Sequence, residues 1–523
     1  MLIHSFLRLA TVGTKLKKHI ITPTNITSTT WHSSHWNANN HAARNFTPPY
    51  CVVRSVTEIH SQQTAPLLHP YTVRIIITIL SVVALAVGGC DRIVTETVLP
   101  KTAADSVEIF RKAFGKPEDC KGCHPRHYDE WSISMHAYSV VDPVFHSLNA
   151  LGQEMTKGEL KQFCVACHSP FATLLNDAPN GTLPSLSQMS PQARGGVTCE
   201  SCHKIEAQRP GHGIDKFRLD GVIMGSVKDP VANSFHASEY NKVFEEGEVC
   251  SGCHDVVNQR GLHVEQTFTE WKTSLYPNRA ISCQTCHMKM DPTPTAIAVG
   301  GPTNRRHHYH FMEGVDVPLT EFPGRDKTIA LVQDQLTANI RAEFLSPMPD
   351  AVLRKGATLD VVYNVYNQFV GHNVPSGTIF ERQMWVEVIV TNENGDTLLA
   401  SGLTDPNGDL RNEKSEYVQR GSLQYDSLLT LYHGKAYRLG KEIPFFFDAD
   451  MVVNRTLNPY ESRNARYSVP ASRIGSSKRL SVSARLLFRA FPPYFLRLLG
   501  HGDLVSKLPV FTVRADQRTV IVQ

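Results

Sequence analysis

Near its start, the sequence lacks a hydrophobic run long enough to cross a membrane. An apolar run from Ile75 to Val87 follows Arg74, but a membrane-spanning helix needs roughly 20 residues. The run leads into Gly88 and Gly89. One basic residue, a short apolar stretch and small residues at its end are typical of a secretory signal.

The residues VGGC, ending at Cys90, resemble the cleavage box of bacterial lipoproteins. In that interpretation residues 73–90 are a signal peptide, and Cys90 is the lipid-bearing start of the mature chain. Translation would then begin near Val73, and residues 1–72 are a doubtful N-terminal extension. We expect a protein of the periplasm or cell envelope, held at the membrane through lipidated Cys90. The alternatives are a short membrane anchor and a cleaved signal without lipid.

The body of the chain lacks an excess of either charge. The formal net charge of the whole chain is +4, but from Asp91 onward 46 basic residues face 48 acidic ones. A strongly basic surface is the usual mark of nucleic-acid binding. The balance therefore predicts no nucleic-acid partner.

Beyond Cys90 the chain has no cysteine outside one repeated motif. C-x-x-C-H is the attachment site of c-type haem: two thiols bind the haem, and the next histidine reaches the iron. The ten cysteines form five such motifs: Cys120, Cys123 and His124; Cys164, Cys167 and His168; Cys199, Cys202 and His203; Cys250, Cys253 and His254; Cys283, Cys286 and His287.

Five motifs of this kind predict five c-type haems. Zinc sites use C-x-x-C pairs, and exported proteins use disulfides, but neither explains a histidine at the same place in every motif. The motifs lie between Cys120 and His287, which is too little chain for a separate apolar core around each cofactor. We therefore expect the haems to pack against one another and to form a path for electrons.

Each iron has a second axial position, and internal repeats point to two of its ligands. SMHA, which contains His136, recurs as SFHA, which contains His236. We predict that both histidines are distal iron ligands. A second repeat pairs EWSISMH with EWKTSLY, where Tyr276 stands in the place of His136. We expect Tyr276 to be a packing residue.

Several segments resemble those of the cytochrome c554 and hydroxylamine oxidoreductase-like multihaem cytochromes. They are CKGCHPRHYDEWSISMHA, GVTCESCHKI, TFTEWKTSLYPNRAISCQTCHMKM, RRHHYHFMEGVDVPL and VGHNVPSGTIFERQMWVEV. The resemblance covers roughly residues 110–400. It implies that His310 or His308, together with His372, returns as a distal ligand from beyond the last motif.

For the fifth distal ligand we choose His212, with His146 and His263 as alternatives. Two departures from related enzymes bear on function. The chain has no C-x-x-C-K motif, which multihaem nitrite reductases carry at the catalytic haem, and hydroxylamine oxidoreductases carry more haems. Both departures weigh against those two activities.

The C-terminal third changes to β-rich runs, at 359–367, 384–392 and 480–488, with a tight-hairpin signal at Asn394-Gly395. The predicted fold is α+β: a mostly helical, haem-packed cytochrome domain over 91–330, followed by an all-β immunoglobulin-like sandwich over 331–523.

The predicted function is electron transfer along closely packed bis-histidine haems, between a membrane or periplasmic donor and an acceptor protein. Two alternatives stay open. One is an oxidoreductase acting on a small nitrogen or sulfur compound at a five-coordinate haem. The other is a subunit of a conductive extracellular filament. The sequence leaves open whether the protein is an enzyme and favours an electron-transfer role.

Overall fold

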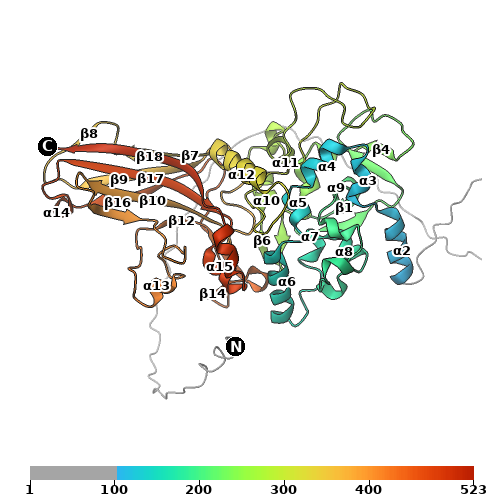
Figure 1. Cartoon of the computed structure of the whole chain (residues 1–523), viewed down its shortest axis with the longest axis horizontal. Helices are drawn as coiled ribbons and strands as arrows, with labels where there is room; N and C mark the ends of the chain where they lie inside the picture. Colours follow the sequence, from blue (N-terminus) through green and yellow to red (C-terminus); the bar gives the residue numbers. More distant parts are fainter. Residues whose placement is uncertain (1–102) are drawn as a thin grey trace, which may run out of the picture. The chain divides into compact units, whose positions relative to one another are not determined.

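The computed structural model describes residues 103–523 (Figure 1). The predicted N-terminal extension, the signal peptide and Cys90 lie outside the described residues. The described residues belong to one compact unit. In this part of the chain, no helix is both long and apolar enough to cross a membrane.

Short helices carry the region of the cysteine motifs. Several begin with proline, whose fixed φ suits the first helical position. The helices are α2 (Ala103–Ala113), α3 (Pro117–Lys121), α4 (Pro125–Trp131), α5 (Met135–Tyr138), α6 (Pro143–Met155), α7 (Val165–His168), α8 (Pro170–Leu174), α9 (Cys199–His203), α10 (Thr267–Thr273) and α11 (Cys283–His287).

Three small strand pairs accompany these helices. β1 (Ile205–Gln208) and β2 (Ile214–Phe217) are antiparallel, as are β5 (Val256–Val257) and β6 (His263–Glu265). β3 (Val222–Gly225) pairs with β4 (Ala237–Tyr240) in parallel. The connection between these two parallel strands carries His236.

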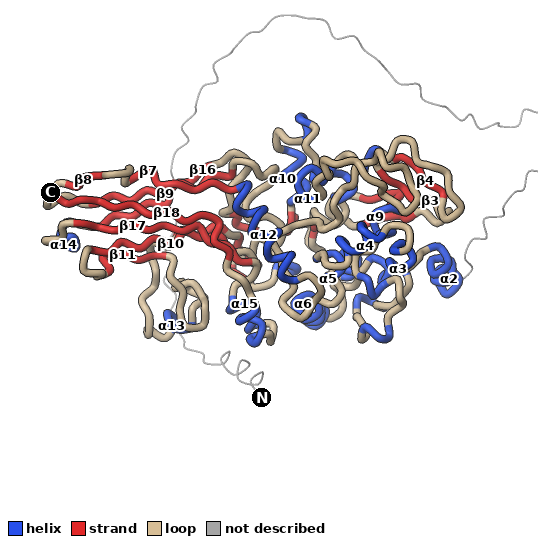
Figure 2. Tube along the Cα trace, turned by 45° about the horizontal axis from the view of Figure 1, so that its top comes forward, coloured by secondary structure: helices blue, strands red, loops and turns tan. Residues whose placement is uncertain are grey.

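Long strands dominate the C-terminal region and lie side by side in Figure 2. The largest sheet has the order β11-β10-β17-β18-β8, with β12 also paired to β10; the others are β16-β9-β7 and β14-β13-β15. The strands are β7 (Ile340–Ser346), β8 (Ala351–Leu353), β9 (Leu359–Asn367), β10 (Gln383–Asn392), β11 (Thr397–Ser401), β12 (Thr430–Tyr432), β13 (Gly434–Arg438), β14 (Lys441–Ile443), β15 (Met451–Asn454), β16 (Ser462–Val469), β17 (Arg479–Arg489) and β18 (Phe511–Val522).

The three β-rich runs predicted from the sequence are strands β9, β10 and β17. Burial alternates along β9, as expected for a strand with one face in the core. β10 and β11 form the predicted hairpin, and Gly395 turns the chain with a φ of 87°. Helices and strands therefore both build the chain. The immunoglobulin-like strand order stays a prediction.

One hydrophobic core joins the sheets to the helical region. It contains Val361 of β9, Val388 of β10 and Leu486 of β17, together with Val144 of α6 and Val332 of α12 (Arg325–Asn339). The predicted domain boundary at residue 330 lies within α12. Three short helices lie beside the sheets: α13 (Glu416–Gln419), α14 (Ala471–Ile474) and α15 (Pro493–Leu498).

Candidate cofactor and metal site

Each cysteine motif forms a tight helical turn. The backbone N–H of the motif histidine donates to the carbonyl of the first cysteine in three of them, with His124 at 2.8 Å, His168 at 3.1 Å and His254 at 3.0 Å. In the other two the motif itself is a helix, α9 or α11. All ten cysteines are half-buried free thiols. Both thiols and the imidazole of each motif line the same cavity, as haem attachment requires.

A connected cavity of 1530 Å³ links the five motifs. Single small-molecule sites usually occupy about 300–1,000 Å³, so this cavity has room for more than one group. Its lining includes all ten motif cysteines and all five motif histidines. Thiols in pairs, with imidazoles beside them, are the donor set of c-type haem. The residues present therefore fit the predicted cofactor.

Backbone carbonyls orient three of the motif histidines. The Nδ1–H of His124 donates to the carbonyl of Ile297 at 2.8 Å, and that of His203 to Met224 at 2.6 Å. The Nδ1–H of His287 donates to the carbonyl of Glu313. These bonds leave Nε2 free to bind a metal. Burial lowers the pKa of His203 and of His287, which favours the neutral form that ligates iron.

Four motif histidines face a second histidine across the cavity. If an iron–imidazole bond is about 2 Å long, as in other histidine–metal sites, and each ring centre lies about 1 Å beyond its nitrogen, two axial rings stand about 6 Å apart. The four pairs, with the distance between ring centres, are His124 and His236 (6.4 Å), His254 and His136 (6.1 Å), His203 and His310 (6.4 Å), and His287 and His372 (6.2 Å).

The second histidine of each pair also has its Nδ1 engaged. That of His310 donates to the carbonyl of His308 at 2.7 Å, and that of His372 to the carbonyl of Asn373 at 2.8 Å. The Nδ1 of His136 meets the sulfur of Met312 at 2.7 Å. The Nδ1 of His236 donates to the carbonyl of Ala237 at 3.2 Å. In all four histidines the Nε2 is left for a metal.

Other predicted candidates do not face a motif histidine at this distance. His212 and the alternative His263 are exposed and do not line the cavity. The alternative His146 has its Nε2 donating to the carbonyl of Val140 at 2.7 Å. His308 lines the cavity, and its Nδ1 binds the carbonyl of Met288 at 3.0 Å. Of His308 and His310, the structure therefore brings His310 into a pair.

His168 is the exception among the motif histidines. Its described ring contact is the phenyl ring of Phe145, stacked at 4.2 Å and 2° between planes. A ring stacked on the imidazole face does not occupy the position across the iron. The Nδ1 of His168 is buried without a hydrogen-bond partner. Among the described residues, no histidine pairs with His168 as in the other four sites.

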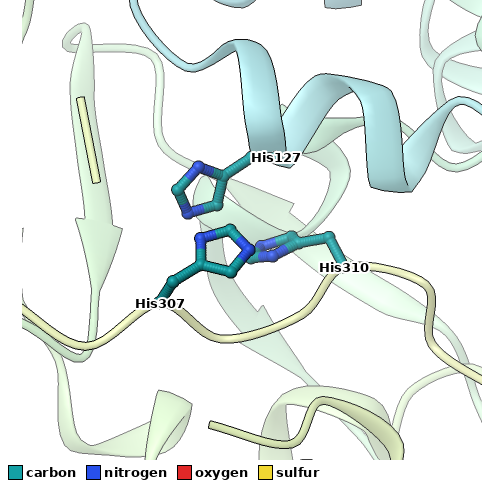
Figure 3. Close-up of side chains that lie close together, drawn as sticks. All are labelled: His127, His307 and His310. Atoms are coloured by element: carbon teal, nitrogen blue, oxygen red, sulfur yellow. The ribbon is translucent and has the colours of Figure 1, made fainter. Parts of the chain in front are cut away.

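Three histidines, His127, His307 and His310, lie close together (Figure 3). One ring nitrogen of each lies within 4.8 Å of one ring nitrogen of the other two. The Nε2 of His307 donates to Glu130 at 2.7 Å, and His310 faces His203. Burial lowers the pKa of His127 to about 2. The cluster therefore packs His127 and His307 against one candidate ligand, His310.

Tyr276 stands in the place of His136 in the sequence repeat, and its side chain is buried against another aromatic ring. The ring of Tyr276 stacks on that of Tyr460 at 5.7 Å, and its exposed fraction is 7%. Nearby, the loop before β10 delivers His372 to the pair with His287. Tyr276 therefore packs against an aromatic ring, and a distant loop brings His372 opposite His287.

Cysteines of different motifs meet inside the cavity. Such contacts show which sites are neighbours. The thiol pairs are Cys120 with Cys199, Cys167 with Cys253, and Cys250 with Cys283. Cys202 lies within electrostatic reach of both Cys250 and Cys253.

Comparisons with known proteins agree with this donor set. Residues 119–204 match the family model of cytochrome c554 and c-prime. The structure is similar to a penta-heme cytochrome c552 from Thermochromatium tepidum, with 18% identity, a TM-score of 0.55, and coverage of 78% of this chain and 99% of that chain. This chain is a multihaem c-type cytochrome.

Two further comparisons add nothing to that assignment. MtrC from Shewanella baltica OS185 matches the cytochrome with 9% identity and a TM-score of 0.17, covering 65% of this chain and 44% of that chain. A TM-score so low carries no argument. No curated protein matches the cytochrome.

Proposed function

We propose that this cytochrome carries electrons along five closely packed c-type haems, four of them held between two histidines. The observation that carries the proposal is the set of four histidine pairs with ring centres 6.1–6.4 Å apart. An iron with both axial positions filled by histidine exchanges electrons and has no open position for a substrate. The proposed distal ligands are His136, His236, His310 and His372, and His212 is left out because it is exposed.

The cysteine contacts support a branched path. We name each site by its motif histidine. The His124 site adjoins the His203 site, which lies next to the His254 site. The His254 site also adjoins the His168 and His287 sites. In this order the His254 site is the junction, and the His124, His168 and His287 sites are the ends.

We place the cytochrome in the periplasm or cell envelope, anchored through lipidated Cys90. The short apolar run and the VGGC sequence support this location. Haem attachment to C-x-x-C-H motifs outside the cytoplasm fits it too. The partners are then redox proteins of the envelope, one as donor and one as acceptor.

The His168 site supports a second function, the reduction or oxidation of a small nitrogen or sulfur compound. No histidine faces His168 among the described residues, so a haem held by this motif would have His168 as its one histidine ligand. Glu381 and Arg382 line the cavity, and Glu381 lies within electrostatic reach of Cys164. One carboxyl oxygen of Glu381 and the Nε of Arg382 are buried without partners. Such groups suit the recognition of a small polar molecule.

Spin-state spectroscopy of the oxidised holoprotein tests both functions. We expect four low-spin haems and one high-spin haem that shifts when cyanide or nitrite is added. We expect each of four single alanine variants to convert one further haem to high spin: those at His136, His236, His310 and His372. The same change at exposed His212 is the control and should alter nothing.

Silent alanine variants at the four paired histidines would overturn the ligand set. If every haem of the unmodified protein is low-spin and no signal responds to cyanide, the second function fails while the electron-transfer proposal stands.

A further inference from the structure

The repeated Glu-Trp dipeptide makes the same tryptophan contact in both of its copies. The first copy ends α4 as Glu130-Trp131, and the second lies in α10 as Glu270-Trp271. The indole N–H of Trp131 donates to the carbonyl of Val197 at 2.8 Å. That of Trp271 donates to the carbonyl of Ile281 at 2.9 Å.

Both acceptor carbonyls stand at the same place relative to a haem motif. Val197 lies two residues before Cys199, and Ile281 lies two residues before Cys283. In each motif the intervening residue caps the helix: the N–H of Thr198 bonds to Ser201, and that of Ser282 to Thr285. Each indole therefore fixes the chain where it enters a motif helix.

The glutamate of each copy holds the segment that carries the opposite ligand. Oε2 of Glu130 accepts the backbone N–H of His310 at 2.8 Å. Oε2 of Glu270 accepts the backbone N–H of Asn373 at 3.1 Å and the hydroxyl of Ser376 at 2.6 Å. Asn373 directly follows His372. Both glutamates have side chains largely withdrawn from solvent.

These contacts connect the two sides of a single site in each copy. Trp131 holds the motif of His203, and Glu130 holds His310, which faces His203. Trp271 holds the motif of His287, and Glu270 holds the segment of His372. His372 faces His287. Adjacent side chains on one helix thus set the separation of two axial histidines.

We propose that each Glu-Trp dipeptide is a positioning unit for one haem, with the tryptophan fixing the motif and the glutamate fixing the distal histidine. The inference rests on the proposed ligand set. Without Glu270, the loop that bears His372 loses two hydrogen bonds to the helical region, and the distal imidazole moves away from the iron. The site then weakens or loses its sixth ligand, and its reduction potential shifts.

The test uses full-length holoprotein with Glu270→Ala, Glu270→Gln, His372→Ala and the double variant. We expect Glu270→Ala to convert the same haem to high spin as His372→Ala, so the double variant should show no more high-spin haem than His372→Ala. Glu270→Gln keeps an oxygen that accepts both hydrogen bonds, and its spectrum should return to low spin. Glu343→Ala, at an exposed residue of β7, is the matched control and should match the unmodified protein.

The outcomes separate the inference from the proposed function. If His372→Ala leaves every haem unchanged, the ligand set is wrong. If His372→Ala produces a high-spin haem while Glu270→Ala keeps the unmodified spin states and potentials, the positioning role is wrong and the ligand set stands. A high-spin signal in the double variant that exceeds that of His372→Ala would also overturn the inference, because Glu270 would then act on another site.

Discussion

The buried carboxyl group of Glu381 predicts that the stability of this cytochrome depends on pH. Burial raises the pKa of Glu381 to about 7, although the charge of Arg382 and a hydrogen bond from Thr378 act in the opposite direction. Asp142 and Asp316 face the same group and add to the rise. The folded protein therefore binds this proton more tightly than the unfolded chain does. The stability that comes from neutral Glu381 is full below about pH 4.5 and is lost as the pH rises through 7.

Glu381→Gln should remove most of the stability loss that occurs as the pH rises through 7. The amide stays neutral at every pH, so we expect the variant to be more stable than the unmodified protein at pH 8, by up to about 3 kcal/mol. At pH 4.5 the two should be nearly equal. Denaturant unfolding at both pH values measures the difference, with Glu321→Gln at an exposed position as the control. If the free energy of unfolding changed equally with pH in the unmodified protein and in Glu381→Gln, Glu381 would not be a buried carboxyl with a raised pKa.

Whether a predicted ligand faces a motif histidine in the structure has physical reasons that can be named residue by residue. His136 and His236 share a local sequence, and the structure places each opposite a motif histidine. His212 has no such repeat, and it lies on an exposed turn. Whether a loop returns to the cavity depends on contacts far along the chain, which a single sequence does not reveal. The unpaired state of His168 is a tertiary property of the same kind.

At the scale of elements, turn chemistry was the most predictable feature. Asn394-Gly395 predicted the hairpin between β10 and β11, because a φ of 87° at Gly395 is strained for most side chains. The Glu-Trp repeat was equally visible, but its contacts were not predicted. A sequence repeat shows that two segments are alike, and only the fold shows which carbonyls and N–H groups they meet.

Gly395→Ala should destabilise the protein by about 1 kcal/mol, because the new methyl group disfavours a positive φ. A Cβ at this position meets no atom within 4 Å, so the cost is conformational and not steric. Gly395→Asn is the matched control: asparagine tolerates this conformation better, so its loss should be smaller. Thermal or denaturant unfolding monitored by circular dichroism measures both. Equal losses for Ala and Asn would argue against a backbone origin.

At the scale of the whole molecule, the proposed electron path is branched, with the His254 site as the junction. Cys253 meets Cys167, Cys250 meets Cys283, and Cys202 lies within electrostatic reach of both Cys250 and Cys253. In this proposed path, every electron that moves between branches passes the site of His136, the proposed distal ligand of the junction. His236 serves the His124 site at one end.

Replacing His136 with methionine should turn the junction into an electron trap. A thioether ligand raises the reduction potential of a haem, so the first electron should settle at the junction and move on slowly. His236→Met makes the same chemical change at an end of the path. Electrons that move among the other sites need not pass this end. Stopped-flow reduction followed by haem absorbance should then show slowed redistribution in His136→Met only. If both variants slow redistribution equally, or the end variant alone does, the branch order read from the cysteine contacts is wrong.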